Sequence, residues 1–156
     1  MAQAAIADPG IGRVVDLLGG RSAFDQPFST ALEAHANIQR GFPSKSLLVF
    51  VRSFPSLGRE DTIDKVVGVS LRTLQRHKKS GATERLNRDQ SGKLYKAAEI
   101  LAKAVDVFGS TEAAERFLDE PAMALDSLRP IELLSTPAGA ELVERHLGRL
   151  EYGVYT

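Results

Sequence analysis

The chain has 156 residues, of which 43% are hydrophobic and 26% are charged, so it can fold around one sizeable core or two small ones. It contains no cysteine, which excludes a disulfide framework and thiolate metal sites. No apolar run approaches the roughly 18–20 residues of a membrane helix, and the first residues lack the basic flank and apolar stretch of a signal peptide. We therefore expect a soluble, cytoplasmic protein that does not enter a membrane.

The formal net charge is zero, but the charges are unevenly distributed along the chain. Residues 52–103 hold twelve Lys/Arg and six Asp/Glu, whereas residues 104–156 hold four Lys/Arg and ten Asp/Glu. The first 51 residues hold four of each kind. A basic segment suits a polyanion such as DNA, and an acidic segment suits a different partner.

Apolar residues at helical spacing predict three helices before residue 55. The first apolar stripe consists of Ile11, Val14, Val15 and Leu18, and it is followed by Gly19-Gly20. The second, weaker stripe consists of Leu32, His35, Ala36 and Ile38, and it is followed by Gly41. The third begins at Ser44, stops at Pro55 and consists of Leu47, Leu48, Phe50, Val51 and Phe54. Because residues 1–43 are thinly hydrophobic, we expect them to form a peripheral helical extension.

Capping signals predict further helices after residue 86. Asn87 and Gln90 form a relative of the capping box at the start of the longest helix, which Gly109 ends. The apolar face of that helix consists of Leu94, Ala98, Leu101, Val105 and Phe108. Ser110 can cap the next helix, whose apolar residues are Ala113, Ala114, Phe117 and Leu118. Pro130 and Pro137 occupy first helical positions, and only the last few residues leave room for a strand, so we predict an all-α fold.

The segment 59–81 has the layout of a helix-turn-helix. The first helix would bury its apolar residues, which are Ile63, Val66 and Val67. Gly68 would supply the positive φ of a tight turn, Val69 would fill the angle between the helices, and Ser70 would cap the second helix.

The second helix of this pair has one cationic side. At about 100° per residue, Leu71, Leu74 and Lys78 lie on the side that faces the core. Because Arg can bind guanine bidentately, and Lys and Thr can contact phosphates, the other side suits DNA. The predicted DNA-binding residues are Ser70, Arg72, Thr73, Arg76 and Lys79; flanking phosphates are within reach of Arg59, Lys65, Arg85 and Arg88. The alternative is a solvated helix face in an ordinary bundle.

The last residues are unusually apolar for a terminus. Gly148 stands where a helix C-cap is expected, with Arg145 in the final turn. Beyond Gly148 lie Leu150, Tyr152, Val154 and Tyr155, and the sequence ends with Thr156 and its carboxylate. Since termini usually carry small polar residues, these side chains need a cover, which is either the chain's own domain or a partner protein.

Several of these segments together resemble the Xre/MbcA/ParS antitoxins, which pair with RES-domain toxins. The similar segments are residues 69–76, 86–109 and 148–156, and residues 130–134 with Thr136 and Gly139 match the toxin-binding domain of that family. Residues 17–21 and 40–43 extend the resemblance to about residues 12–156, whereas residues 24–28 depart from it.

The resemblance implies a helical bundle of three parts: an N-terminal extension (1–43), an Xre-like helix-turn-helix region (44–103) and a small toxin-binding domain with a C-terminal tail (104–156). It further implies an antitoxin that binds its operon's promoter as a homodimer and represses it. The tail would cover the active site of a RES-domain toxin that either consumes NAD or modifies a protein with ADP-ribose. The implied toxin-binding residues are Arg149, Glu151, Tyr152, Gly153, Val154, Tyr155 and Thr156.

Two other classes of function differ from this one. A stand-alone helix-turn-helix regulator would use its acidic C-terminal domain for dimerisation or ligand sensing. An enzyme is not indicated, because the three histidines, His35, His77 and His146, are far apart. Glu141 and Glu144 lack a complementary base or nucleophile, and Gly19-Gly20 lacks the strand of a phosphate loop. We therefore predict no catalytic residue, no metal site and no cofactor.

Overall fold

The computed structural model describes residues 6–59, 61–81 and 83–153. These residues form nine α-helices, and the only β-pairing among them consists of two isolated bridges, Pro43–Arg85 and Ala122–Leu128. The predicted all-α fold is therefore confirmed.

The helices begin and end close to the capping and helix-breaking residues identified in the sequence. In chain order they are α1 (Pro9–Leu17), α2 (Ala31–Arg40), α3 (Ser44–Ser53), α4 (Thr62–Val67), α5 (Leu71–Lys79), α6 (Arg88–Phe108), α7 (Thr111–Asp119), α8 (Pro130–Leu133) and α9 (Pro137–Glu151). Short 3-10 turns lie between them, namely η1 (Gly20–Ser22), η2 (Pro55–Gly58) and η3 (Met123–Leu125). The Asn87–Gln90 capping box, the Ser110 cap and both prolines are present as predicted.

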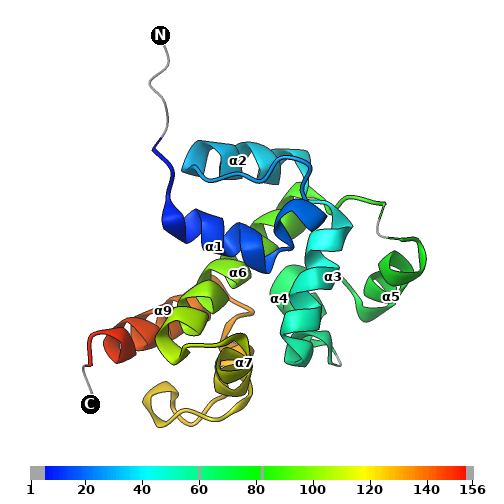
Figure 1. Ribbon diagram of the computed structural model, residues 1–156. Coiled ribbons are helices and arrows are strands. Elements are labelled where there is room, and N and C mark those ends of the chain that lie inside the picture. The colour runs from blue at the N-terminus through cyan, green and yellow to red at the C-terminus, as the bar shows by residue number, and fades with distance from the viewer. Residues whose placement is uncertain (1–5, 60, 82, 154–156) are drawn as a thin grey trace.

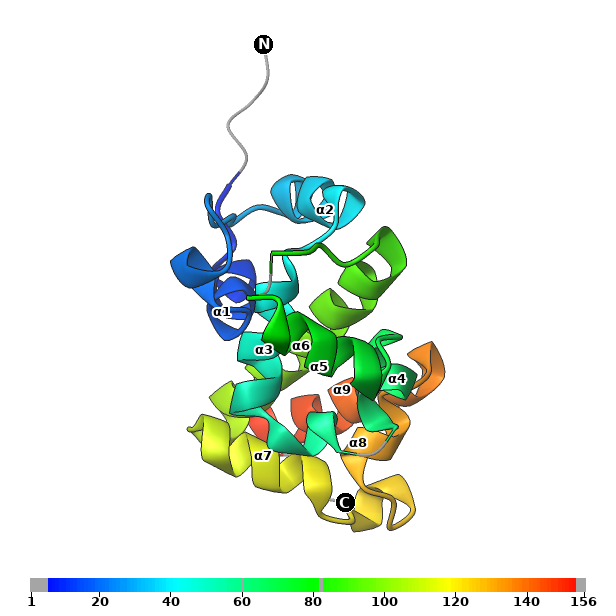
Figure 2. The ribbon, with the colours of Figure 1, turned by 90° about the vertical axis from the view of Figure 1, so that its right-hand side faces the viewer.

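Helix α6 runs through the middle of the molecule and contacts α1, α2, α4, α7 and α9 (Figure 1). Helix α2 lies at the top of Figure 1, α5 at the right and the C-terminal end of α9 at the lower left. After the 90° turn of Figure 2, α5 faces the viewer and α7 again lies at the bottom. The helix with the predicted DNA-binding residues and the end of α9 therefore lie on opposite sides of α6.

The N-terminal segment is part of the core, contrary to the expectation of a peripheral extension. Phe24, Phe28 and Phe42 are buried, and the Phe24 ring lies edge-on to the other two with centroids 5.4 and 5.3 Å away. Helix α1 packs directly on α6. The sequence did not indicate that this segment is part of the core. Its three buried rings lie in short segments between helices, so they do not form an apolar stripe at helical spacing.

The predicted inner face of α2 is also wrong. Leu32 is 73% exposed and His35 is exposed, whereas Ala34 is buried. The helix turns Ala34 and Ile38 towards the core, and Ile38 approaches Gly92 of α6. A small residue and a glycine let two helices approach closely, which outweighs the burial of one leucine.

Helix α9 is longer than predicted, because Gly148 lies inside it and not at its end. The helix continues to Glu151, and the positive φ of 70° that follows its end belongs to Gly153. Leu147 is fully buried, and Glu151 reaches Lys103 of α6 at 3.9 Å. These contacts with α6 stabilise the last turn of α9, although Gly148 by itself would favour a helix end.

Candidate functional sites

The turn between α4 and α5 has the predicted layout. Gly68 adopts a left-handed φ of 82°, and its carbonyl accepts a hydrogen bond of 3.0 Å from Nε2 of Gln90 on α6. Val69 is buried in the angle between the helices. Ser70 caps α5, because its Oγ accepts a 3.1 Å bond from the backbone N–H of Thr73. A side chain at position 68 would strain this backbone, so the glycine at the turn determines how α5 leaves α4.

Helix α5 is rotated slightly from the predicted orientation. Leu74 is fully buried as predicted, but the other buried residue is His77, while Lys78 is exposed and Leu71 is only half-buried. Burying an imidazole costs less than burying an ammonium group, so the helix buries His77 and leaves the lysine in solvent.

The predicted DNA-binding residues divide into two groups. Arg72, Arg76 and Lys79 project into solvent from α5. By contrast, Ser70 and Thr73 already use their hydroxyl groups in the cap, where Ser70 Oγ donates to Thr73 Oγ1 at 2.9 Å. The exposed face of α5 therefore consists of its cations, whereas the two hydroxyl groups stabilise the first turn of the helix.

An acidic residue that the sequence reasoning missed lies beside this face. Glu84 Oε2 accepts a 3.1 Å hydrogen bond from Arg76 Nη2, and the same oxygen is 3.6 Å from His77 Nδ1. The signal for this pair was an isolated glutamate in the loop directly after a strongly cationic helix. A phosphate or base that bound Arg76 would have to displace this carboxylate.

The four flanking cations contact their own chain. Arg59 and Lys65 pair with Asp119 at 3.0 Å and with Asp61 at 3.1 Å, respectively. Arg85 Nη1 donates to the Gly41 carbonyl at 2.7 Å, and Arg88 Nη1 donates to Gln39 at 3.5 Å. Their reach to flanking phosphates stays a prediction.

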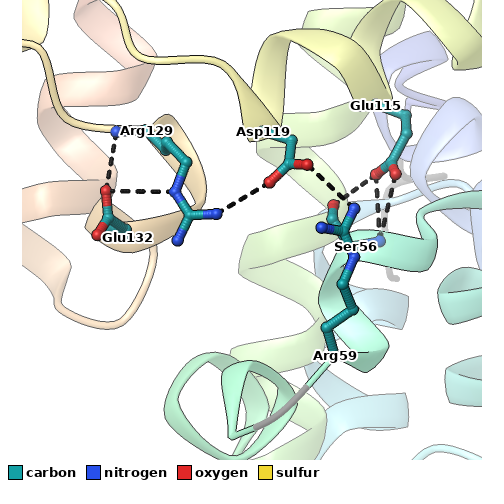
Figure 3. Close-up of polar contacts among 6 residues, drawn as sticks. All are labelled: Ser56, Arg59, Glu115, Asp119, Arg129 and Glu132. Carbon is teal, nitrogen blue, oxygen red and sulfur yellow. Dashed lines mark hydrogen bonds and ion pairs between the residues drawn. The ribbon is translucent and has the colours of Figure 1, made fainter.

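A polar network joins η2, just before α4, to α7 and α8 (Figure 3). The Glu115 carboxylate accepts bonds from Ser56 Oγ at 2.5 Å and from the Ser56 N–H at 3.2 Å. Asp119 binds Arg59 at 3.0 Å through one oxygen and Arg129 at 3.1 Å through the other. Because Ser56 is buried, Glu115 supplies hydrogen-bond partners that solvent does not supply there.

The predicted toxin-binding residues lie at the end of α9. Arg149 is exposed, Glu151 pairs with Lys103, and Tyr152 is 80% exposed. Gly153 is exposed as well, whereas Val154, Tyr155 and Thr156 lie outside the described residues. Among the described residues the tail is therefore not covered by its own domain, since Tyr152 projects into solvent.

Aromatic rings form a row between α6, α7 and α9. Phe117 lies between Phe108, at a centroid distance of 4.9 Å, and the imidazole of His146, which stacks on it at 6.0 Å. Partial burial lowers the pKa of His146, and the nearby charge of Arg149 lowers it further, so the neutral ring is favoured. Sequence reasoning placed Phe108 and Phe117 on inner faces, but both are only partly covered.

Two acidic side chains of α9 form ion pairs at its surface. Glu141 pairs with Arg145 at 2.6 Å, and Glu144 pairs with Lys96 of α6 at 2.7 Å. The hydrogen bond that Lys96 donates to the Glu144 carboxylate raises the pKa of Lys96. Within residues 6–59, 61–81 and 83–153, no group of three His, Asp or Glu side chains is placed to hold a metal ion. In the same residues, no helix combines the length and apolarity needed to cross a membrane.

Comparison with known proteins identifies the segment that contains the row of rings and Tyr152. Residues 103–153 match the model of a family described as the antitoxin Xre/MbcA/ParS C-terminal toxin-binding domain. This segment is similar to that domain. We call residues 103–153 the toxin-binding domain, after the description of the family that they match.

Two relatives match most of the chain. It is 29% identical over 121 residues to an antitoxin Xre of Pseudomonas putida, covering 78% of this chain and 72% of the relative. It is 23% identical over 129 residues to an antitoxin Xre of Photorhabdus laumondii subsp. laumondii, covering 82% of this chain and 84% of the relative. The predicted resemblance to the Xre/MbcA/ParS antitoxins is therefore confirmed.

Proposed function

We propose that this chain is the antitoxin of a type II toxin–antitoxin module. It neutralises a RES-domain toxin through the toxin-binding domain and represses its own operon through α5. The observation that carries the proposal is the match of residues 103–153 to a toxin-binding domain, together with similarity to two Xre antitoxins over most of the chain. Neutralisation is binding without chemistry, so the proposal needs no catalytic residue.

The exposed end of α9 supports neutralisation by blocking the toxin's active site. A site that consumes NAD must bind phosphates and planar rings, so it presents cations and apolar or aromatic walls. Tyr152 offers an exposed ring, and Gly153 offers a slim backbone at the point where the tail leaves the helix. Charged hydrogen bonds of the kind that a phosphate site forms are worth about 1.5–3 kcal/mol each.

Growth rescue tests neutralisation. A RES-domain toxin is expressed alone and together with the chain, and growth and cellular NAD are followed. We expect co-expression to restore both. The double variant Arg72→Ala/Arg76→Ala serves as the matched control and should rescue equally well, because both side chains lie on α5, away from the toxin-binding domain. A chain that binds the toxin but leaves growth arrested would contradict the proposal.

The exposed cations of α5 support autorepression. If about three cations per half-site contact phosphates in a dimer, log affinity falls with log salt at a slope of roughly −5. Binding of a labelled promoter fragment at several salt concentrations measures this slope. If the affinity changed neither with salt nor with the Arg72→Ala/Arg76→Ala substitution, the proposed DNA binding by α5 would be wrong.

We also propose a homodimer. The apolar faces of residues 94–118 are one candidate for its interface, but Leu94, Leu101 and Leu118 of those faces are fully buried within one chain, so the contact would need other side chains. A two-fold operator still favours a symmetric protein. Light scattering should give twice the 16.9 kDa mass of the chain at micromolar concentration.

A further inference from the structure

Helix α5 buries a histidine with an unpartnered ring nitrogen. His77 is 3% exposed, and within residues 6–59, 61–81 and 83–153 its Nδ1 atom has no hydrogen-bond partner. An unpartnered polar atom in a protein interior costs free energy, so its presence calls for a reason. The group beside it is Glu84, whose Oε2 lies 3.6 Å from Nδ1, just beyond hydrogen-bond distance.

The same oxygen of Glu84 binds Arg76. Oε2 accepts a hydrogen bond of 3.1 Å from Arg76 Nη2, and Arg76 is one of the cations that α5 exposes. One carboxylate oxygen thus lies beside both a buried imidazole and an arginine that is proposed to contact DNA. Glu84 is itself exposed, in the segment between α5 and α6, so its side chain can shift between these two neighbours.

We propose that His77 and Glu84 make the DNA contact of Arg76 depend on pH. This inference rests on the DNA binding proposed for α5 and adds a proton to it. Histidine is the side chain whose charge ordinarily changes between about pH 5 and 8. A proton on His77 makes Nδ1 a charged donor, which attracts the Glu84 carboxylate and weakens its hold on Arg76. The DNA-bound chain then holds more protons than the free chain, so affinity rises as the pH falls.

The other charges around His77 make Glu84 the deciding group. Helix α5 and the helix packed against it, α3, carry no acidic residue. Their charged side chains are Lys45, Arg52, Arg72, Arg76, Lys78 and Lys79. Asp61 and Asp64, at the start of α4 and within it, lie more than 4 Å from the imidazole, and Arg85 is bonded to the Gly41 carbonyl. Because the cations oppose a further positive charge, Glu84 is the one described carboxylate near enough to favour it.

Operator affinity measured against pH tests this coupling in the full-length chain. Fluorescence anisotropy follows binding to a labelled fragment of its own promoter at fixed salt, at pH 8 and at pH 6. The unchanged chain should bind about fivefold or more tightly at pH 6, which is the lower end of typical coupling between two sites. Glu84→Gln should bind tightly at both pH values.

A matched control removes a different carboxylate. Asp61→Asn takes a negative charge from the start of α4, where Asp61 pairs with Lys65 and not with His77, and should keep the full pH dependence. His35 and His146 are present in every variant, so their titration cancels from the comparison. Calorimetry in two buffers of different ionisation enthalpy should show proton uptake when the unchanged chain binds the fragment, and less uptake for Glu84→Gln.

Each outcome of this experiment decides a separate point. Equal pH dependence in Glu84→Gln and the unchanged chain overturns the inference, as does an affinity of the unchanged chain that is the same at both pH values. Failure of the unchanged chain to bind the fragment at either pH overturns the proposed DNA binding itself. His77→Gln should also remove the pH dependence; if this buried substitution lowers the melting temperature, the exposed Glu84→Gln change alone decides the question.

Discussion

The region around α5 and the toxin-binding domain present opposite kinds of surface on one continuous core. Helix α5 exposes Arg72, Arg76, Lys78 and Lys79, and none of the seven exposed large hydrophobic residues of the described chain lies on it. The toxin-binding domain exposes five of those seven. A polyanion is bound by charge and a protein by apolar area, so each surface matches the chemistry of one proposed partner. Two partners can thus be bound by one small chain without sharing residues.

Removing residues 152–156 gives the largest expected effect and separates the two regions. Because α9 continues to Glu151, this deletion leaves the whole helix and its contacts with α6. We expect the shortened chain to lose protection of toxin-expressing cells, while operator affinity and melting temperature stay unchanged. Growth curves and an NAD assay with purified toxin measure the loss. Full protection by the shortened chain would mean that the helices before residue 152, and not the tail, neutralise the toxin.

Substitution of the α5 cations should affect DNA alone and reveal the influence of Glu84. We expect Arg72→Ala to weaken operator binding by about 1–3 kcal/mol, as for an arginine that reads a base. Arg76→Ala should cost less, because Arg76 gives up its bond with Glu84 before it binds DNA. Glu84→Gln should then raise affinity. Fluorescence anisotropy compares the three variants, and a larger loss for Arg76→Ala than for Arg72→Ala would contradict this order.

The contact between the two regions should contribute to stability mainly through Glu115. Glu115→Ala leaves the buried Ser56 groups without their partner and should lower the unfolding free energy by about 1–3 kcal/mol. Asp119→Ala removes ion pairs with two half-exposed arginines and should cost about 0–1 kcal/mol. Urea unfolding measures both. Equal losses would mean that the ion pairs of Asp119, and not the buried bond, hold the regions together.

The smallest effect concerns His146 and acid stability. Its pKa is lowered below the ordinary 6.5 in the folded chain, so the unfolded chain binds more protons at this position. Stability from the neutral ring is therefore present above about pH 6.5 and declines as the pH falls towards the folded pKa. Urea midpoints at pH 7.5 and 5.5 should differ less in His146→Gln than in the unchanged chain. An equal difference in both would show that the stacked imidazole does not contribute.

Local signals in the sequence predicted the helices well, whereas packing between distant segments could not be predicted. Capping residues such as Asn87 and Ser110 and the turn at Gly68 act within a few residues, so the sequence alone indicates them. The helix end predicted at Gly148 was wrong, because contacts between α9 and α6 outweigh the tendency of glycine to end a helix. The ring stack at Phe117 joins three separate helices, and one sequence carries no signal for such distances.

The exposed residues of the candidate sites were likewise predictable where they depend on helical periodicity, and not where they depend on packing. Arg72, Arg76 and Lys79 project as expected from helical periodicity, and Tyr152 is exposed as the resemblance implied. The inward turn of His77 was not predicted, because a helix with only two leucines, Leu71 and Leu74, can rotate slightly at little cost. The row of rings formed by Phe108, Phe117 and His146 was not predicted. Phe108 and Phe117 have the spacing of core residues, and only the packed fold shows how much of each ring stays exposed.

The central claim is that DNA and toxin are bound by different regions of the chain, and their simultaneous binding tests it most directly. Size-exclusion chromatography with light scattering is carried out on operator, antitoxin and toxin, alone and mixed. Since α5 and the end of α9 lie on opposite sides of α6, we expect one complex that contains all three components. Stoichiometric release of the operator when toxin is added would contradict the account, because the two partners would then compete for one surface.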